Sequence, residues 1–213
     1  MDWRLLLASA LVATIALAHS VQGERRLRAP DGLPPGTPRG LRLGWHLASA
    51  LLLAGAGIVS ILAAAPQAPA APRLAGLLGT TAATILMAIA ALHGWWALAG
   101  TRGLRAVIPE RDDGTPLFRP GRIGTAAVAL ALAGASGLVA QQALGLPGPF
   151  PAALLLPGGL LLALALIARA VGERQYLGLF KTRRQSLFAL LDTGLYTPLC
   201  LFLGLATAAV CLL

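Results

Sequence analysis

The chain has 213 residues, of which 57% are hydrophobic and only 12% are charged, with a formal net charge of +9 at pH 7. A soluble globular domain carries about 25% charged residues, so this composition excludes a soluble fold. The basic residues lie in short stretches between long apolar runs, which argues against a surface that follows a nucleic acid. We therefore expect an all-α, polytopic protein embedded in a lipid bilayer, with no nucleic-acid partner.

Six apolar stretches are long enough to cross a bilayer. A spanning helix needs about 20 mostly apolar residues, because the hydrocarbon core is about 30 Å thick and a helix rises about 1.5 Å per residue. In chain order the stretches are Leu5–Val21, Leu43–Ala65, Leu74–Leu98, Gly124–Leu146, Phe150–Val171 and Leu187–Leu213. Their many Ala and Gly residues favour close helix packing, so we expect one compact bundle.

The basic residues predict how the chain is threaded. With six spans, the loops after the first, third and fifth helices share one side and carry all but two of the 17 Lys and Arg residues. The other side has only Arg4 and Arg73. Because Lys and Arg stay in the cytoplasm, we expect a multi-pass protein of a bacterial-type inner (plasma) membrane with both termini extracytoplasmic.

The first stretch has a second interpretation. Ala16 and Ala18 form an AxA pattern after an apolar run, as in a cleavable signal peptide. Cleavage would place the basic segment around Arg25 and the basic loop around Arg111 outside, against the orientation rule. The distribution of charge therefore favours a retained first helix.

The three histidines fall at the predicted cytoplasmic edge. His19 ends the first stretch, His46 begins the second, and His93 lies near the end of the third. Together with Glu24 they have the ligand types of a transition-metal site. No two of them have metal-ligand spacing on one helix, so interfacial anchoring or ordinary hydrogen bonding explains them better than a metal site. A role as an acid or base is the third alternative.

Asp192 lies five positions inside the last stretch, where an unpaired carboxylate is costly. We expect it to pair with Arg169, Arg174 or Lys181. The pair would be either a structural lock on the preceding loop or part of a substrate or proton site.

Two tyrosines and one glutamate accompany Asp192 as candidates for a catalytic role. Tyr196 follows it by one helical turn and would share its face. Tyr176 lies in the loop before the last stretch, and Glu24 follows the first stretch.

The strings LHGWWALAG, AVIPERDDGTPLFRPG and GERQYLGLFKTRRQSLFALLDTGLYTPLCL resemble a family of small bacterial four-helix membrane proteins of unknown function. The resemblance covers residues 74–213. It implies a four-helix membrane domain and points to Asp192, Tyr196 and Tyr176, but it implies no reaction. Residues 1–73 would then be an N-terminal two-helix extension, similar to the opening helices of other uncharacterised membrane proteins.

These observations predict a polar cluster at the cytoplasmic edge that binds a small lipophilic molecule, a quinone-like headgroup or a metal. The alternative is a structural or accessory subunit that packs against a membrane-protein partner or another copy of itself. A small transporter fits less well, because the middle of most helices lacks polar side chains. The residues leave open whether the protein is an enzyme and identify no cofactor beyond a transition metal.

Overall fold

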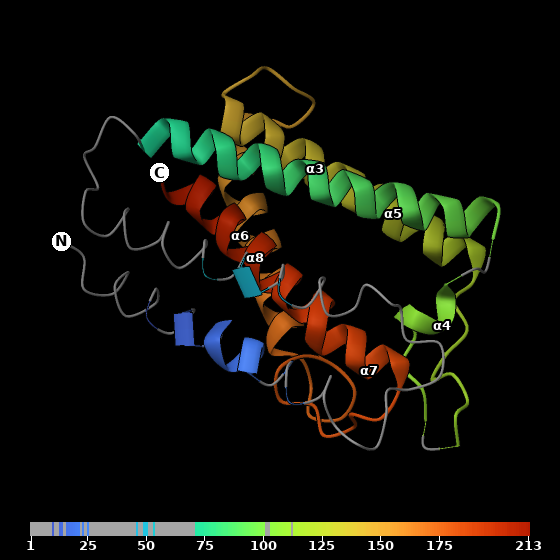
Figure 1. The fold of residues 1–213 in the computed structure, drawn as a ribbon. Helices are drawn as coiled ribbons and strands as arrows, with labels where there is room; N and C mark the ends of the chain where they lie inside the picture. The colour runs from blue at the N-terminus through green and yellow to red at the C-terminus, as the bar shows by residue number, and fades with distance from the viewer. Residues whose placement is uncertain are drawn as a thin grey trace. The chain divides into compact units, whose positions relative to one another are not determined.

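The computed structural model describes residues 71–100, 103–111 and 113–213, together with residues 10, 13, 14, 16–21, 23, 25, 46, 49, 50 and 53 (Figure 1). The described residues form helices and no strand, apart from one isolated bridge between Glu110 and Pro116. The expected all-α class is confirmed. All described residues before position 71 are helical, but most of the first two predicted spans lies outside the described residues.

Four helical segments of the described chain can cross a membrane. The first three are α3 (Ala71–Leu98), α5 (Arg122–Leu144) and α6 (Ala152–Val171). The fourth is continuous from α7 (Leu187–Leu191) through the π-helix η1 (Asp192–Tyr196) to α8 (Thr197–Leu212). A short helix, α4 (Leu104–Val107), lies between α3 and α5. The chain is therefore a multi-pass membrane protein, whereas the count of six spans and the placement of the termini stay predictions.

Helix boundaries follow local chemistry. α5 ends at Gly145, which adopts the left-handed conformation that only glycine takes without strain (φ 62°, ψ 23°). α7 is capped by Ser186, whose hydroxyl oxygen accepts a hydrogen bond from the Ala189 N–H. The loop before α7 is thus fixed at its end by an N-cap.

The chain divides into two compact units. The first contains residues 1–68, 105–117 and 166–202, and the second contains residues 69–104, 118–165 and 203–213. The predicted division into an N-terminal extension of residues 1–73 and a four-helix domain of residues 74–213 stays a prediction.

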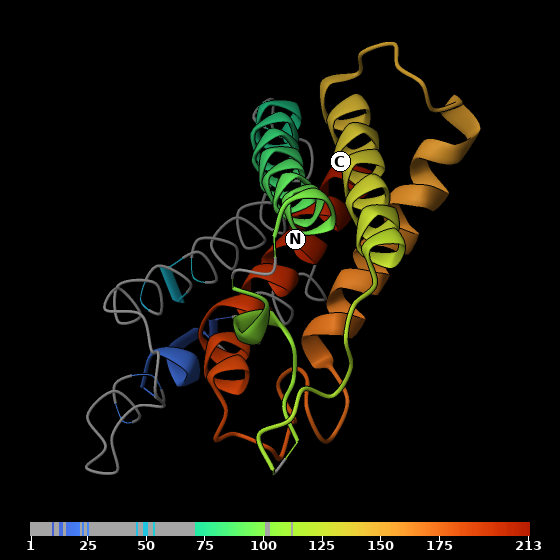
Figure 2. The same ribbon diagram turned by 90° about the vertical axis from the view of Figure 1, so that its right-hand side faces the viewer.

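In the second unit, α3 and α5 lie side by side along a seam of small residues (Figure 2). A Cβ added to Gly79 would lie 2.1 Å from Ala143 Cβ. The two helices can approach this closely only because residue 79 has no side chain. The Ser136 hydroxyl donates to Ala83 O at 2.7 Å across the same contact. We call Gly79, Ala83, Ser136 and Ala143 the small-residue seam.

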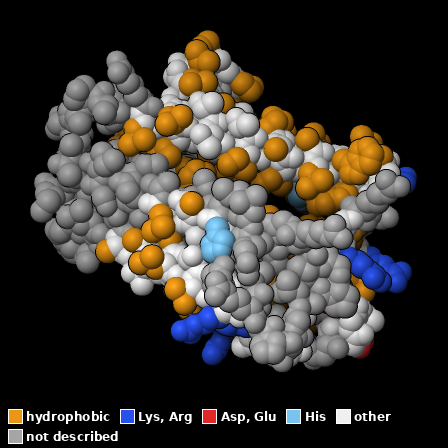
Figure 3. Space-filling model, viewed as in Figure 1, with side chains coloured by type: hydrophobic (Ala, Val, Ile, Leu, Met, Phe, Trp, Pro, Cys, Tyr) orange, Lys and Arg blue, Asp and Glu red, His pale blue; other side chains and the backbone are white. Residues whose placement is uncertain are grey.

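The outer faces of the long helices are apolar. Leu77 and Met87 on α3 are exposed, as is a row of leucines on α6: Leu154, Leu156, Leu160, Leu161 and Leu164. Hydrophobic side chains cover much of the described surface in Figure 3. A surface of this kind requires lipid rather than water around it.

Candidate functional site

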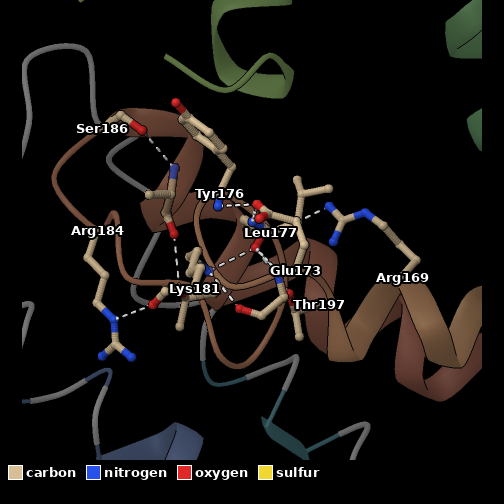
Figure 4. Close-up of polar contacts among 12 residues, drawn as sticks. Arg169, Glu173, Tyr176, Leu177, Lys181, Arg184, Ser186 and Thr197 are labelled. Atoms are coloured by element: carbon tan, nitrogen blue, oxygen red, sulfur yellow. Dashed lines mark hydrogen bonds and ion pairs between the residues drawn. The ribbon is translucent and has the colours of Figure 1, made fainter. Parts of the chain in front are cut away.

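In the first unit, a fully buried carboxylate gathers four hydrogen-bond donors. Asp192 Oδ1 accepts from Arg169 Nη2 at 2.6 Å. Its Oδ2 accepts from Lys181 Nζ at 2.8 Å, the Gly178 N–H at 2.9 Å and the Thr197 hydroxyl at 3.2 Å. Arg169, Lys181 and Thr197 converge from three different segments (Figure 4). We call these five residues the Asp192 cluster.

The predicted ion pair of Asp192 is confirmed, with two cationic partners instead of one. Arg169 comes from the last turn of α6 and Lys181 from the following loop, where it is 2% exposed. Arg174, the third candidate, is exposed and lies outside the cluster. The four donors equal in number the acceptor positions of a carboxylate, with one donor on Oδ1 and three on Oδ2.

Two glycines fold the loop of residues 172–186 back onto the end of α6. Gly172 and Gly178 have φ values of 74° and 79°, which other residues adopt only with strain. A Cβ on Gly178 would lie 2.5 Å from Val171 O, and the Leu179 N–H donates to Ala170 O at 3.0 Å. This fold presents the Gly178 N–H and the Lys181 side chain to Asp192.

Glu173 organises the same loop from within. Its carboxylate accepts the backbone N–H groups of Tyr176, Gln175 and Leu177. These donors, that of Tyr176 first, lower the pKa of the Glu173 carboxyl because they favour its charged form. Glu173 therefore serves as a local brace for the loop.

The turn that contains Asp192 is a π-helix, and proline explains why. Pro198 has no N–H, and in a regular α-helix its ring would clash with the carbonyl of Gly194. The helix widens by one residue, so that the Thr197 N–H donates to Asp192 O, five residues back. Thr197 therefore contacts the Asp192 carboxylate.

The expected shared face of Tyr196 and Asp192 stays a prediction, and the hydrogen bond and ring contact of Tyr196 are to Ala106 and Phe188. The Tyr196 hydroxyl donates to Ala106 O of α4 at 3.2 Å, and its ring lies 6.1 Å from that of Phe188. Tyr196 anchors α4 to the last span.

Tyr176 lies elsewhere in the first unit, with the Arg183 guanidinium 5.0 Å from the centre of its ring. The backbone N–H of Tyr176 donates to Glu173. The described contacts of this tyrosine thus belong to the internal structure of the loop. Glu24, the fourth catalytic candidate, lies outside the described residues.

His19 also belongs to the first unit and contacts the π-helix η1, which we call the π-turn. Its Nε2 lies 2.7 Å from Thr193 O, and its Nδ1 lies 2.7 Å from Ser49 Oγ. A carbonyl oxygen only accepts, so Nε2 carries the proton and donates. His19 and Ser49 are both buried, at 7% and 3% exposed.

The other two histidines are divided between the units. His46, in the first unit, is close enough to His19 for an electrostatic interaction. His93, in the second unit, donates from Nδ1 to Ile89 O at 2.8 Å and packs edge-on against Trp96. Among the described residues, no group of three or more His, Cys, Asp and Glu side chains is placed to hold a metal ion. The three-histidine metal site stays a prediction.

Sequence reasoning missed three groups of this region: the Thr197 hydroxyl, the Gly178 N–H and the Ser49 hydroxyl. Pro198, six residues after Asp192, was the available signal for an irregular turn that brings Thr197 to the carboxylate. No comparable signal marks a backbone N–H or a serine far away in the chain.

One family model matches the chain, under the description Protein of unknown function (DUF3995), over residues 86–207. This range is more than half of the 213 residues and contains the complete Asp192 cluster. No curated protein and no solved structure matches the chain.

Proposed function

Since the chain belongs to the DUF3995 family, whose function is unknown, we propose a function from the Asp192 cluster. This multi-pass membrane protein binds a small lipophilic molecule with an anionic headgroup, which Arg169 recognises. The site lies at the cytoplasmic edge of an inner membrane, where the basic loops are expected to stay.

The observation that carries the proposal is an unused donor on Arg169. Its Nη1 is buried and has no hydrogen-bond partner among the described residues, while Nη2 is held by Asp192. A buried donor left unpaired costs about 1–3 kcal/mol, so such an atom calls for a ligand or an ordered solvent molecule.

The charge of the cluster points to an anion. Arg169 and Lys181 supply two positive charges and Asp192 one negative charge, which leaves an excess of one positive charge. A guanidinium already fixed through one nitrogen is suited to bind a carboxylate or phosphate through another. The Arg169 side chain as a whole is 30% exposed while Nη1 itself is buried, so binding requires a side-chain movement that brings Nη1 to the headgroup.

The binding test uses the purified full chain in neutral detergent. The probes are oleate and phosphatidylglycerol as anionic amphiphiles, oleyl alcohol as the neutral analogue, and a short-chain ubiquinone for the quinone-like alternative. Arg169→Lys keeps a cation beside Asp192 but removes the planar second nitrogen. Arg174→Gln removes one exposed positive charge from the adjacent loop and is the matched control.

We expect an anionic amphiphile to bind the wild type and Arg174→Gln equally, and Arg169→Lys at least about tenfold more weakly, as for the loss of one charged hydrogen bond. Equal binding by wild type and Arg169→Lys would contradict the proposal. So would equal binding of oleyl alcohol and oleate. If the quinone binds and neither anionic amphiphile does, the proposal of an anionic headgroup is wrong and the ligand of Arg169 is a neutral hydrogen-bond acceptor.

A second candidate is a structural or accessory subunit. It is favoured by the four hydrogen bonds that Asp192 accepts, because they fix the loop of residues 172–186 to the last span. Purification from native membranes tests it: a membrane-protein partner at a fixed ratio supports this role, and a chain that elutes alone contradicts it. A fixed complex of several copies would identify the partner as the chain itself.

In the metal-binding proposal, His19, His46 and His93 would be ligands of one transition-metal ion. Metal binding competes with the hydrogen bonds of His19, because both ring nitrogens of this residue already have partners. Metal analysis of the purified protein tests the proposal. Stoichiometric metal that is lost in His46→Ala would support it, and its absence from the wild type would contradict it.

A further inference from the structure

The π-turn leaves one backbone carbonyl without its helical donor. In an α-helix, Thr193 O would accept from the Thr197 N–H, but that group donates to Asp192 O. The next residue along, Pro198, has no N–H to offer. Thr193 O is therefore free to accept a hydrogen bond from outside its own helix.

A residue from the N-terminal segment supplies this hydrogen bond. His19 Nε2 donates to Thr193 O at 2.7 Å, across 174 positions of sequence. Ser49, from the second predicted span, lies against the opposite ring nitrogen and fixes the orientation of the imidazole. In a membrane an unsatisfied carbonyl costs several kcal/mol, so this contact matters more than a hydrogen bond at a wet surface.

We infer that the N-terminal segment is a built-in partner of the DUF3995 domain, docked through His19 onto the Thr193 carbonyl that the π-turn exposes. His19 and Ser49 both precede residue 86, where the family match begins, and Thr193 lies inside the match. Residues 1–68 and the π-turn belong to the same compact unit. The segment brings its own donor to an acceptor created by the domain.

The chemistry of the contact defines the partner that this surface accepts. The partner is an apolar helix that carries an N–H donor rigid enough to reach a backbone carbonyl at the edge of the π-turn. A domain of this family without such a segment would need the donor from a separate chain or from solvent. This inference is independent of ligand binding at Arg169.

A double-mutant cycle in the full chain tests the docking contact. Pro198→Ala restores an N–H at position 198 and permits the regular α-helix, in which Thr197 donates to Thr193 O. The second change is His19→Phe, which keeps an aromatic ring of similar size but removes the donor. The unfolding equilibrium constant of each variant is measured in mixed micelles, and hydrogen exchange is followed in residues 10–25 and 187–196.

We expect His19→Phe to raise the unfolding constant about 5- to 30-fold, the range for one or two kcal/mol, and to accelerate exchange in both segments. In the Pro198→Ala background the same change should have less than about a twofold effect, because Thr193 O already has a partner. Equal effects in the two backgrounds would overturn the inference.

His19→Gln gives a readout that does not depend on the folding of Pro198→Ala. Its amide can donate to a carbonyl, so it should restore at least half of the lost exchange protection, whereas His19→Phe should not. If His19→Gln and His19→Phe behave alike, water or lipid satisfies Thr193 O and the histidine does not dock the segment.

Discussion

The Asp192 cluster and the small-residue seam hold parts of the same membrane protein together by opposite means. At the seam, α3 and α5 approach because Gly79 has no side chain, and the Ser136 hydroxyl donates a hydrogen bond across the contact. In the cluster, a buried carboxylate holds a loop through two cations, a backbone N–H and a hydroxyl.

The difference shows where each kind of contact is useful. Helices surrounded by lipid gain little from burying more apolar surface, so close van der Waals contact holds them. The loop of residues 172–186 is too polar to pack in this way, and charge fixes it instead. Charged contacts leave donors such as Arg169 Nη1 available, so the cluster, and not the seam, is the place to look for function.

The largest loss of stability should come from a substitution in the Asp192 cluster. Asp192→Ala leaves Lys181 and Arg169 as buried or half-buried cations without their anion, and breaking such a pair costs about 3–5 kcal/mol. Unfolding free energies in mixed micelles measure this loss. Asp192→Ala combined with Lys181→Met should lose less than the single change, because the most deeply buried cation is gone. A double variant less stable than Asp192→Ala would show that charge does not dominate.

The next largest loss of stability should come from enlarging a side chain in the small-residue seam. Gly79→Ala places a Cβ 2.1 Å from that of Ala143, and overpacking of this kind costs about 1–3 kcal/mol. Adding Ala143→Gly should recover part of the loss. Gly94→Ala is the matched control on the same helix, since its added Cβ meets nothing within 4 Å. Equal effects at positions 79 and 94 would mean that the seam is loose.

The hydrogen bond across the seam should contribute less. Ser136→Ala removes the bond to Ala83 O and leaves the helices in contact. Hydrogen bonds between membrane helices are worth about 0.6 kcal/mol on average, and we expect a loss of that size in the same unfolding assay. A loss as large as that of Gly79→Ala would show that the seam also depends on polar contacts.

The smallest effect on stability should be the pH-dependent contribution of the Glu173 carboxylate. Its pKa is lowered in the folded protein by the N–H donors of Tyr176, Gln175 and Leu177. Its contribution to stability is therefore complete above the unfolded-state pKa of about 4.3 and disappears as the pH falls through the folded-state pKa. Thermal unfolding of wild type and Glu173→Gln should differ at pH 7 and converge in acid. A difference independent of pH would assign the effect to shape instead of charge.

Much of the fold could be predicted from the lengths of the apolar runs in the sequence. The predicted ends at Leu98 and Val171 coincide with the ends of α3 and α6, because the apolar runs stop there. The partners of Asp192 were also predictable, since a carboxylate in a span needs a cation and few were within reach.

The remaining features depend on backbone geometry that side-chain patterns do not encode. The π-turn brings the Thr197 hydroxyl to the Asp192 carboxylate, a contact that α-helical spacing does not predict. The donor from Gly178 and the acceptor on Thr193 are backbone atoms, so no residue type marks them.

Hydrogen exchange at the Gly178 amide tests most directly that Asp192 holds the loop to the last span, because this N–H donates to Asp192 Oδ2 at 2.9 Å. Exchange is compared in wild type and Asp192→Asn, with amides of α3 and α5 as the internal reference. The account predicts slow exchange at Gly178 in the wild type, exchange at least about tenfold faster in the variant, and unchanged exchange along the seam. Equal exchange at Gly178 in the two proteins would contradict it.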